Sequence, residues 1–158
     1  MKPPYVVAIL VLLALVVPAS PAHAGGIVSI CDETHLLAAL AGGGTVTFAC
    51  SGTITLTDTI PVAADMTIDG SGQTVTISGN SAVRTVYVNS GVTLNLNYLT
   101  IANSADSGIY NHGGIVTVSH STFSDNRASG GGGGGLFNNN GTLIVSHSTF
   151  VRNRTDGG

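Results

Sequence analysis

Short runs in which hydrophobic and polar residues alternate recur along the chain from residue 46 onward. In residues 115–119, for example, Val116 and Val118 alternate with Thr117 and Ser119. Alternation with a period of two predicts β-strands, because successive side chains of a strand point to opposite faces. Further runs lie at residues 46–48, 54–56, 66–70, 75–79 and 86–88, and turn-forming Gly, Ser, Asn and Asp separate them. The pattern predicts many short strands.

Two segments of the chain are near-copies of each other. Residues 141–154 repeat residues 114–127 at an offset of 27 positions, and residues 93–101 align with residues 115–123 at an offset of 22. The strand core is constant while one loop, at residues 129–135, changes in length. A repeat of this size without a helix predicts coils of strands stacked on one another, and about five or six coils fit the chain.

Residues 32–41 carry the one helical pattern. Asp32 suits the N-cap and Glu33 the first turn, and glycines at 42–44 end the helix. The predicted apolar face consists of Leu36, Leu37, Leu40 and Ala41. Since the open end of a strand stack needs a cover, the pattern predicts a short N-terminal α-helical cap.

The first 24 residues have the parts of a secretory signal peptide. Lys2 gives a basic start, residues 5–17 are almost wholly apolar, and Ala22-His23-Ala24 forms an A-x-A cleavage site. The apolar run is shorter than the roughly 20 residues that a membrane-spanning helix needs, although an uncleaved anchor is the alternative. We expect a secreted or cell-surface protein with no membrane span in the mature chain.

Cys31 and Cys50 are the only cysteines. An even count in an exported protein predicts a disulfide. A metal site would need two further ligands nearby and only His35 is a candidate, so neither a metal nor a cofactor is predicted. The disulfide would pin the N-terminal cap, which we assign to residues 25–50.

The phenylalanines and asparagines of the repeat form a motif. Phe123 with Asn126, and Phe150 with Asn153, fit F-x-x-N, and each copy follows a glycine-containing turn with a short apolar pair. This repeat resembles that of the polymorphic outer-membrane proteins and of other pectin-lyase-like β-helix proteins of bacterial export, and residues 31–50 look like the cap that precedes such β-helices. The resemblance, with the rule for parallel crossovers, implies an all-β fold: a single-stranded right-handed parallel β-helix (solenoid) behind the helical cap.

The coils are assigned to residues 51–158. By comparison with residues 127–130, the last residues, 156–158, match a loop that leads into another coil. We therefore expect a β-helix truncated at its C-terminus. The alternative is an exposed last coil, for which self-association or a partner that covers it is expected.

Several side chains recur at matching positions. The predicted structural ladder consists of Asn111 with Asn138, Asn126 with Asn153, and Phe123 with Phe150. Stacked asparagines at turns pass hydrogen bonds along a ladder and tolerate a left-handed backbone; ligand contact is the alternative.

His120 and His147 are also equivalent, with Tyr98 one repeat earlier. Their alternation with Val118 and Val145 places these three rings on the outside. We interpret them as a surface ladder. Metal binding by the two imidazoles is the alternative, and no carboxylate repeats beside them.

Charge is low, with a net charge of −3 and 8% charged residues. Stacking accounts for this, because like charges on adjacent coils, about 4.8 Å apart, repel. The chain has no basic stripe with aromatic residues, so nucleic-acid binding is not expected.

Acidic residues give little indication of catalysis. A β-helix lyase needs clustered carboxylates for calcium and a basic residue, and a glycosidase needs a carboxylate pair. The aspartates do not recur at one position of the repeat, none is expected to pair with an arginine at the repeat offset, and Asp125 with Arg127 is the nearest candidate. No catalytic residue is predicted.

The sequence favours a secreted or cell-surface structural or adhesive β-helix protein rather than an enzyme. The expected partners are surface glycans or other host or cell-surface molecules. The alternative is the N-terminal part of a carbohydrate-active enzyme of the β-helix class, a polysaccharide lyase or a glycoside hydrolase. A third interpretation is an autotransporter passenger.

Overall fold

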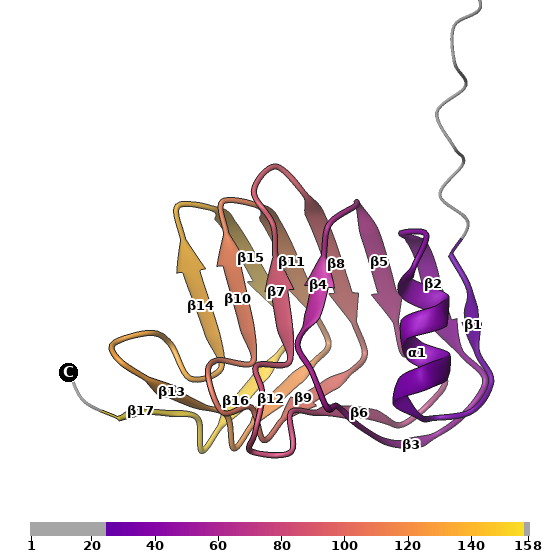
Figure 1. The fold of residues 1–158 in the computed structure, drawn as a ribbon, viewed down its shortest axis with the longest axis horizontal. Coiled ribbons are helices and arrows are strands. Elements are labelled where there is room, and N and C mark those ends of the chain that lie inside the picture. Colours follow the sequence, from indigo (N-terminus) through magenta and orange to yellow (C-terminus); the bar gives the residue numbers. More distant parts are fainter. Residues whose placement is uncertain (1–24, 157–158) are drawn as a thin grey trace, which may run out of the picture.

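Three parallel sheets wind into a right-handed solenoid of about five turns, preceded by one short helix (Figure 1). A computed structural model describes residues 25–156 of the chain. The predicted fold class is confirmed. The predicted signal peptide lies outside the described residues.

Each complete turn of the solenoid contributes one strand to each of the three sheets; β1 precedes the first complete turn, and the last described turn adds strands to the first two sheets only. The first sheet holds β1 (Ile27–Val28), β2 (Gly44–Phe48), β5 (Met66–Asp69), β8 (Thr93–Asn97), β11 (Ile115–Ser119) and β15 (Thr142–Ser146). The second holds β3 (Gly52–Thr55), β6 (Val75–Ser78), β9 (Thr100–Ala102), β12 (Thr122–Ser124) and β16 (Thr149–Val151). The third holds β4 (Ile60–Val62), β7 (Val86–Val88), β10 (Ile109–His112) and β14 (Leu136–Asn139), and β13 (Arg127–Ser129) pairs separately with β17 (Arg154–Asp156).

The sequence repeat corresponds to the register of the coils. Val116 pairs with Leu94, 22 positions earlier, and with Leu143, 27 positions later. The longer offset arises between β12 and β14, where β13 and the glycine-rich residues 130–135 are inserted. Both predicted offsets are thus offsets between stacked coils.

A second insertion lies at the corner between β5 and β6. Met66 pairs with Leu94, 28 positions later, whereas Thr76 pairs with Thr100 only 24 positions later. The extra residues form the loop at residues 70–74, for which the corner between β8 and β9 has only Tyr98 and Leu99. This insertion was not predicted.

The core consists of the inward-facing residues of the strands, stacked coil upon coil. Val46, Ile68, Leu96 and Val118 form one such row and are 0% exposed. Each fully buried aliphatic side chain contributes roughly 1.5–3 kcal/mol. Val145 continues the row in the last described coil, where it is 41% exposed.

The cap consists of α1 (Glu33–Leu40), which packs against β1, β2 and β3 at the N-terminal end of the stack (Figure 1). Asp32 is the N-cap and accepts a hydrogen bond of 2.8 Å from the backbone N–H of His35. The predicted apolar face is partly wrong. Leu36 and Leu40 are buried, but Leu37 is 42% exposed and Ala41 follows the helix as its C-cap.

Two contacts hold the cap to the first coil. Cys31 and Cys50 form the predicted disulfide, with Cα atoms 5.7 Å apart. The carboxylate of Glu33 accepts hydrogen bonds from the backbone N–H of Thr57 at 2.7 Å and from its hydroxyl at 2.8 Å. These bonds lower the pKa of Glu33 below its ordinary value.

Single left-handed residues turn the chain at two corners. Tyr98, His120 and His147 join the first sheet to the second with φ of 54°, 48° and 47°, and Asn103, Asp125 and Arg152 follow the second sheet with φ of 51°, 55° and 53°. Left-handed backbone costs roughly 1–2 kcal/mol for an L-residue other than glycine. The repeated asparagines are not themselves left-handed: Asn126 and Asn153 come one residue after a left-handed residue, and Asn111 and Asn138, which were expected at turns, lie within strands.

Candidate functional site

The first asparagine pair lies between the third sheet and the first. Nδ2 of Asn111 donates to Oδ1 of Asn138 at 2.7 Å and to the carbonyl of Gly114 at 3.0 Å, and Oδ1 of Asn111 accepts from the N–H of Gly114 at 2.9 Å. Asn111 is 2% exposed. Its amide is therefore occupied in joining two coils and closing a corner.

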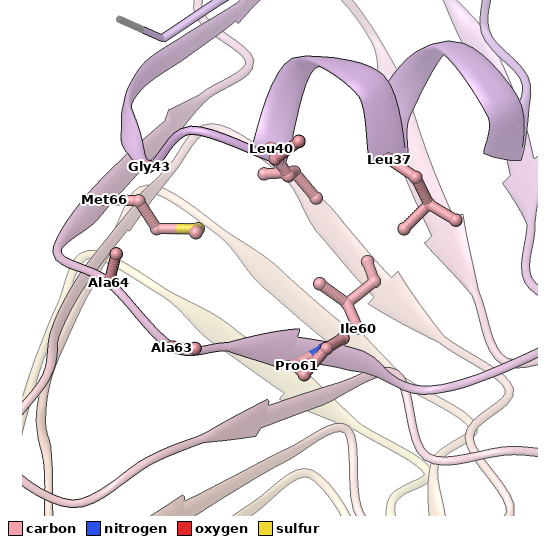
Figure 2. Close-up of a pocket in the computed structure, with 9 residues that line it drawn as sticks. Leu37, Leu40, Gly43, Ile60, Pro61, Ala63, Ala64 and Met66 are labelled. Carbon is pink, nitrogen blue, oxygen red and sulfur yellow. The ribbon is translucent and has the colours of Figure 1, made fainter. Parts of the chain in front are cut away.

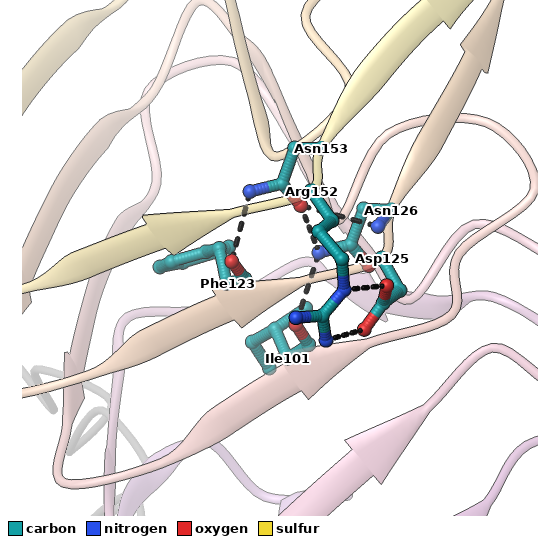
Figure 3. Close-up of polar contacts among 6 residues, drawn as sticks. All are labelled: Ile101, Phe123, Asp125, Asn126, Arg152 and Asn153. Carbon is teal, nitrogen blue, oxygen red and sulfur yellow. Dashed lines mark hydrogen bonds and ion pairs between the residues drawn. The ribbon is translucent and has the colours of Figure 1, made fainter.

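The second asparagine pair connects three coils (Figure 3). Nδ2 of Asn126 donates to the carbonyl of Ile101 at 3.0 Å and to Oδ1 of Asn153 at 2.9 Å, and Nδ2 of Asn153 donates to the carbonyl of Phe123 at 2.8 Å. The rings of Phe123 and Phe150 stack beside them, with centroids 4.9 Å apart. These ladder residues contact one another and the backbone.

The charged residues pair between neighbouring coils. Nε and Nη2 of Arg152 donate to the two carboxylate oxygens of Asp125 at 2.6 and 2.7 Å (Figure 3). Arg84 pairs with Asp106, 22 positions later: its Nη2 donates to the carboxylate and its Nε donates to the backbone carbonyl of Asp106 at 2.8 Å. The expectation that no aspartate pairs with an arginine at the repeat offset is wrong. At the position of Asp125 and Arg152, opposite charges replace one another on successive coils, so this pair attracts where like charges would repel.

A polar hollow of about 290 Å³ lies beside these ion pairs and brings Asp125 and Arg127 together. It is lined by Ser81, Ser104, Ala105, Asp125, Arg127, Ser129 and Arg154. Asp125 is bound by Arg152, whose hydrogen bonds lower the pKa of the carboxyl, and Arg127 is bound by Asp156. Both charges are thus engaged in holding coils together. Among residues 25–156, no three His, Cys, Asp or Glu side chains are grouped so as to hold a metal ion.

The outer ladder of rings follows the corner between the first and second sheets. Tyr98 stacks on His120 with centroids 4.7 Å apart, and His120 stacks on His147 at 4.8 Å, with interplanar angles of 10° and 3°. Tyr98 is 46% exposed, and both histidines are exposed. The rings therefore form a continuous stack on the outside of the solenoid.

A row of threonines runs beside this ladder on the second sheet. It consists of Thr53, Thr76, Thr100, Thr122 and Thr149, each paired with the next. The row was not predicted from the sequence. The signal in the sequence is a threonine at the first or second position of every strand of the second sheet. The changing spacing between these strands hides it.

A second outer row, on the third sheet, was also not predicted. Tyr87 stacks on Tyr110 with centroids 5.3 Å apart, and Phe137 meets the edge of Tyr110 at 5.1 Å. The guanidinium carbon of Arg84 lies 4.6 Å from the centroid of Tyr110. These rings contact one another closely and reinforce the stacking of the coils.

An apolar hollow of about 310 Å³ separates the cap helix from the first coils (Figure 2). Its lining residues are Leu37, Leu40, Ala41, Gly43, Ile60, Pro61, Ala63, Ala64 and Met66. Leu37 and Leu40 extend from α1 towards Ile60 and Pro61 of β4 (Figure 2). None of these side chains is an acid, a base or a nucleophile, so the hollow offers only apolar contact.

These features define the chain as a right-handed parallel β-solenoid whose described outer rows carry threonines and stacked aromatic rings. Comparisons with protein-family models, with curated proteins and with solved structures found no match. Of the helical structure within residues 25–156, nothing is long and apolar enough to cross a membrane.

Proposed function

We propose that this protein is a secreted or cell-surface β-helix with a structural or adhesive role, related to the pectin-lyase-like and polymorphic outer-membrane repeat proteins. The observation that carries the proposal is the outer ladder of Tyr98, His120 and His147 beside an unbroken row of five threonines. These side chains lie in line along the stack. They offer hydroxyls and aromatic rings to a partner that extends along the same axis.

Surface glycans are the proposed partners. A polysaccharide presents many hydroxyls and apolar C–H faces, which threonine hydroxyls and aromatic rings match without any charge. Within residues 25–156 all four arginines form ion pairs with aspartates, as Arg152 does with Asp125, so no free arginine is available to hold an anionic sugar. Binding would then depend on many weak neutral contacts along the rod rather than on one charged group.

Chromatography of the purified chain on immobilised neutral polysaccharides tests this proposal. Retention should change little between low and high salt, because screening weakens exposed charge interactions but not neutral contacts. A matched pair of variants locates the surface: Thr122→Arg in the middle of the row should reduce retention, and Ser29→Arg beside the cap should not. Failure of the chain to bind glycans or cell surfaces would contradict the adhesive role.

A carbohydrate-active enzyme is the second candidate, favoured by the polar hollow that contains Asp125 and Arg127. A polysaccharide lyase would release unsaturated products from polyuronides and lose that activity when calcium is chelated. An arginine is a poor general base because its pKa lies far above neutrality, and Asp125 is held by Arg152. The paired state of these charges is the reason that we place the structural or adhesive role first.

Export is part of the proposal and rests on the basic, apolar and A-x-A segments of residues 1–24. N-terminal sequencing of protein recovered outside the cells tests it. The expected first residue is Gly25. Protein found only inside the cells, with Met1 or Lys2 still attached, would contradict it.

A further inference from the structure

A shallow hollow of about 190 Å³ lies where the outer ladder of rings meets the row of threonines. Tyr98 and His120 line it from the ladder, Thr100 and Thr122 line it from the second sheet, and residues 72–75 line its remaining side. The volume is that of about six water molecules at roughly 30 Å³ each, which suits one sugar ring.

The hollow lies where the corner of one coil, between β5 and β6, is longer than the corner of the next coil, between β8 and β9. Gly70 occupies the ladder position below Tyr98, because Asp69 pairs with Asn97. One face of the Tyr98 ring is stacked on His120, and within residues 25–156 no aromatic ring covers the other face. Gly70 has no ring to continue the ladder, and the following loop residues 72–74 line the hollow. The stack of rings therefore ends at Tyr98, next to the hollow.

The polar groups around the hollow are available for hydrogen bonds. Within the described part of the chain, no hydrogen bond is made by the hydroxyls of Tyr98, Thr100 and Thr122 or by the imidazole of His120. The Gln73 side chain accepts a bond of 2.7 Å from the Ser51 hydroxyl through Oε1, and its amide NH₂ group donates none. Both donors and acceptors thus surround the space.

The charge of the hollow is low. None of the lining residues is an aspartate, glutamate, lysine or arginine. An anionic sugar such as a uronate would lose hydration there without gaining a charged partner, which is costly. The lining thus matches a ligand that has one apolar face, many hydroxyls and no charge.

We propose that this hollow binds one neutral pyranose unit of a glycan, with a C–H face of the sugar against the Tyr98 ring and its hydroxyls bonded to Gln73, Thr100 and Thr122. This inference rests on the proposed adhesive function and names its contact point. Tyr98 would provide the stacking surface, since aromatic faces supply large, rigid contact area. Gln73 would supply the donor that orients the sugar.

Titration of the isotope-labelled chain with free methyl glycosides of glucose, galactose, mannose and N-acetylglucosamine tests the site by NMR. At least one sugar should shift the ring signals of Tyr98 and His120 saturably, while glucuronate should bind more weakly. Tyr98→Ala should lower the affinity by about tenfold, the order that one aromatic contact supplies. Tyr98→Phe, which keeps the ring, should retain most of it, and Ser29→Arg, beside the cap and outside both the ladder and the hollow, is the control.

The wild-type titration is decisive even if Tyr98→Ala fails to fold. The proposal is wrong if no neutral sugar shifts the Tyr98 and His120 signals up to its solubility limit, or if folded Tyr98→Ala binds as well as the wild type. Polysaccharide retention without these shifts would overturn the site but leave the adhesive function. Saturable shifts without retention on any glycan or cell surface would support the site and overturn the adhesive function.

Discussion

Asn126 and Asn153, 27 residues apart in the sequence, are joined by a hydrogen bond of 2.9 Å from Nδ2 of the first to Oδ1 of the second. The same Oδ1 atom also accepts from the backbone N–H of Asn126 at 3.1 Å. Asn126 itself is 0% exposed and bonds the coil below it through Ile101 and Ser104. One side chain therefore joins three successive coils.

Asn126→Ala should destabilise the solenoid more than Asn153→Ala. The first change leaves the carbonyl of Ile101 and the N–H of Ser104 without this buried partner, at a cost of about 2–3 kcal/mol. Asn153 is only partly buried, so its loss should cost less. Urea unfolding of both variants measures the difference, and equal midpoints would contradict the role given to Asn126.

Phe123→Ala should cost about 3–5 kcal/mol, the usual range for a large aromatic side chain lost from a core. Phe123 is 0% exposed, whereas its stacking partner Phe150 is 46% exposed. Phe150→Ala is therefore the matched control and should have a distinctly smaller effect. Unfolding followed by circular dichroism measures both, and a larger loss from Phe150→Ala would contradict the described packing.

The ion pair between coils should appear in the titration of Asp125. Hydrogen bonds from Arg152 hold the pKa of Asp125 below its ordinary value. The pair therefore adds stability above the unfolded pKa of about 3.9, and this contribution disappears as the pH falls through the lower folded pKa. Arg152→Ala should raise the pKa of Asp125 and remove that part of the acid dependence.

NMR titration of the Asp125 carboxyl measures this pKa directly. Arg154→Ala is the comparison: Arg154 lowers the pKa of Asp125 through its charge alone, so its loss should raise that pKa less than the loss of Arg152 does. An unchanged Asp125 pKa in Arg152→Ala would show that the pair does not form in solution.

Reduction of the Cys31–Cys50 disulfide should destabilise the capped end. The bond closes a loop with a sequence separation of 19 residues. A loop of this size corresponds to about 3 kcal/mol in the chain-entropy account. Thermal unfolding with and without reductant measures the change, and a paired Cys31→Ser, Cys50→Ser variant without reductant should reproduce it.

The fold could be predicted because its two main determinants are local in the sequence. Alternation at Val116 and Val118 determines which side chains face inward, and near-identical copies 27 residues apart reveal the stacking. The insertion at residues 70–74 escaped prediction because the coils on either side of it are not copies of each other. Its position became clear only from the pairing of Asp69 with Asn97.

The charged and left-handed positions could not be predicted for a different reason. The pair of Asp125 and Arg152 was not predicted, because a change of charge sign at one position of a repeat looks like variation of an exposed surface residue. In the stack these residues are neighbours and attract each other. Likewise, bulky Tyr98 and His120 are poor choices for left-handed corners by intrinsic preference, and stacking of their rings offsets that cost.

The central claim is tested most directly by measuring polysaccharide binding and polysaccharide cleavage in the same sample. The chain is incubated with neutral polysaccharides and with polyuronides, in the presence of calcium and of a chelator, and bound sugar and soluble products are quantified together. We predict that a neutral polysaccharide is retained and recovered at full length under both conditions. Release of shortened or unsaturated products, lost on chelation or in Asp125→Asn, would contradict the adhesive account and identify an enzyme.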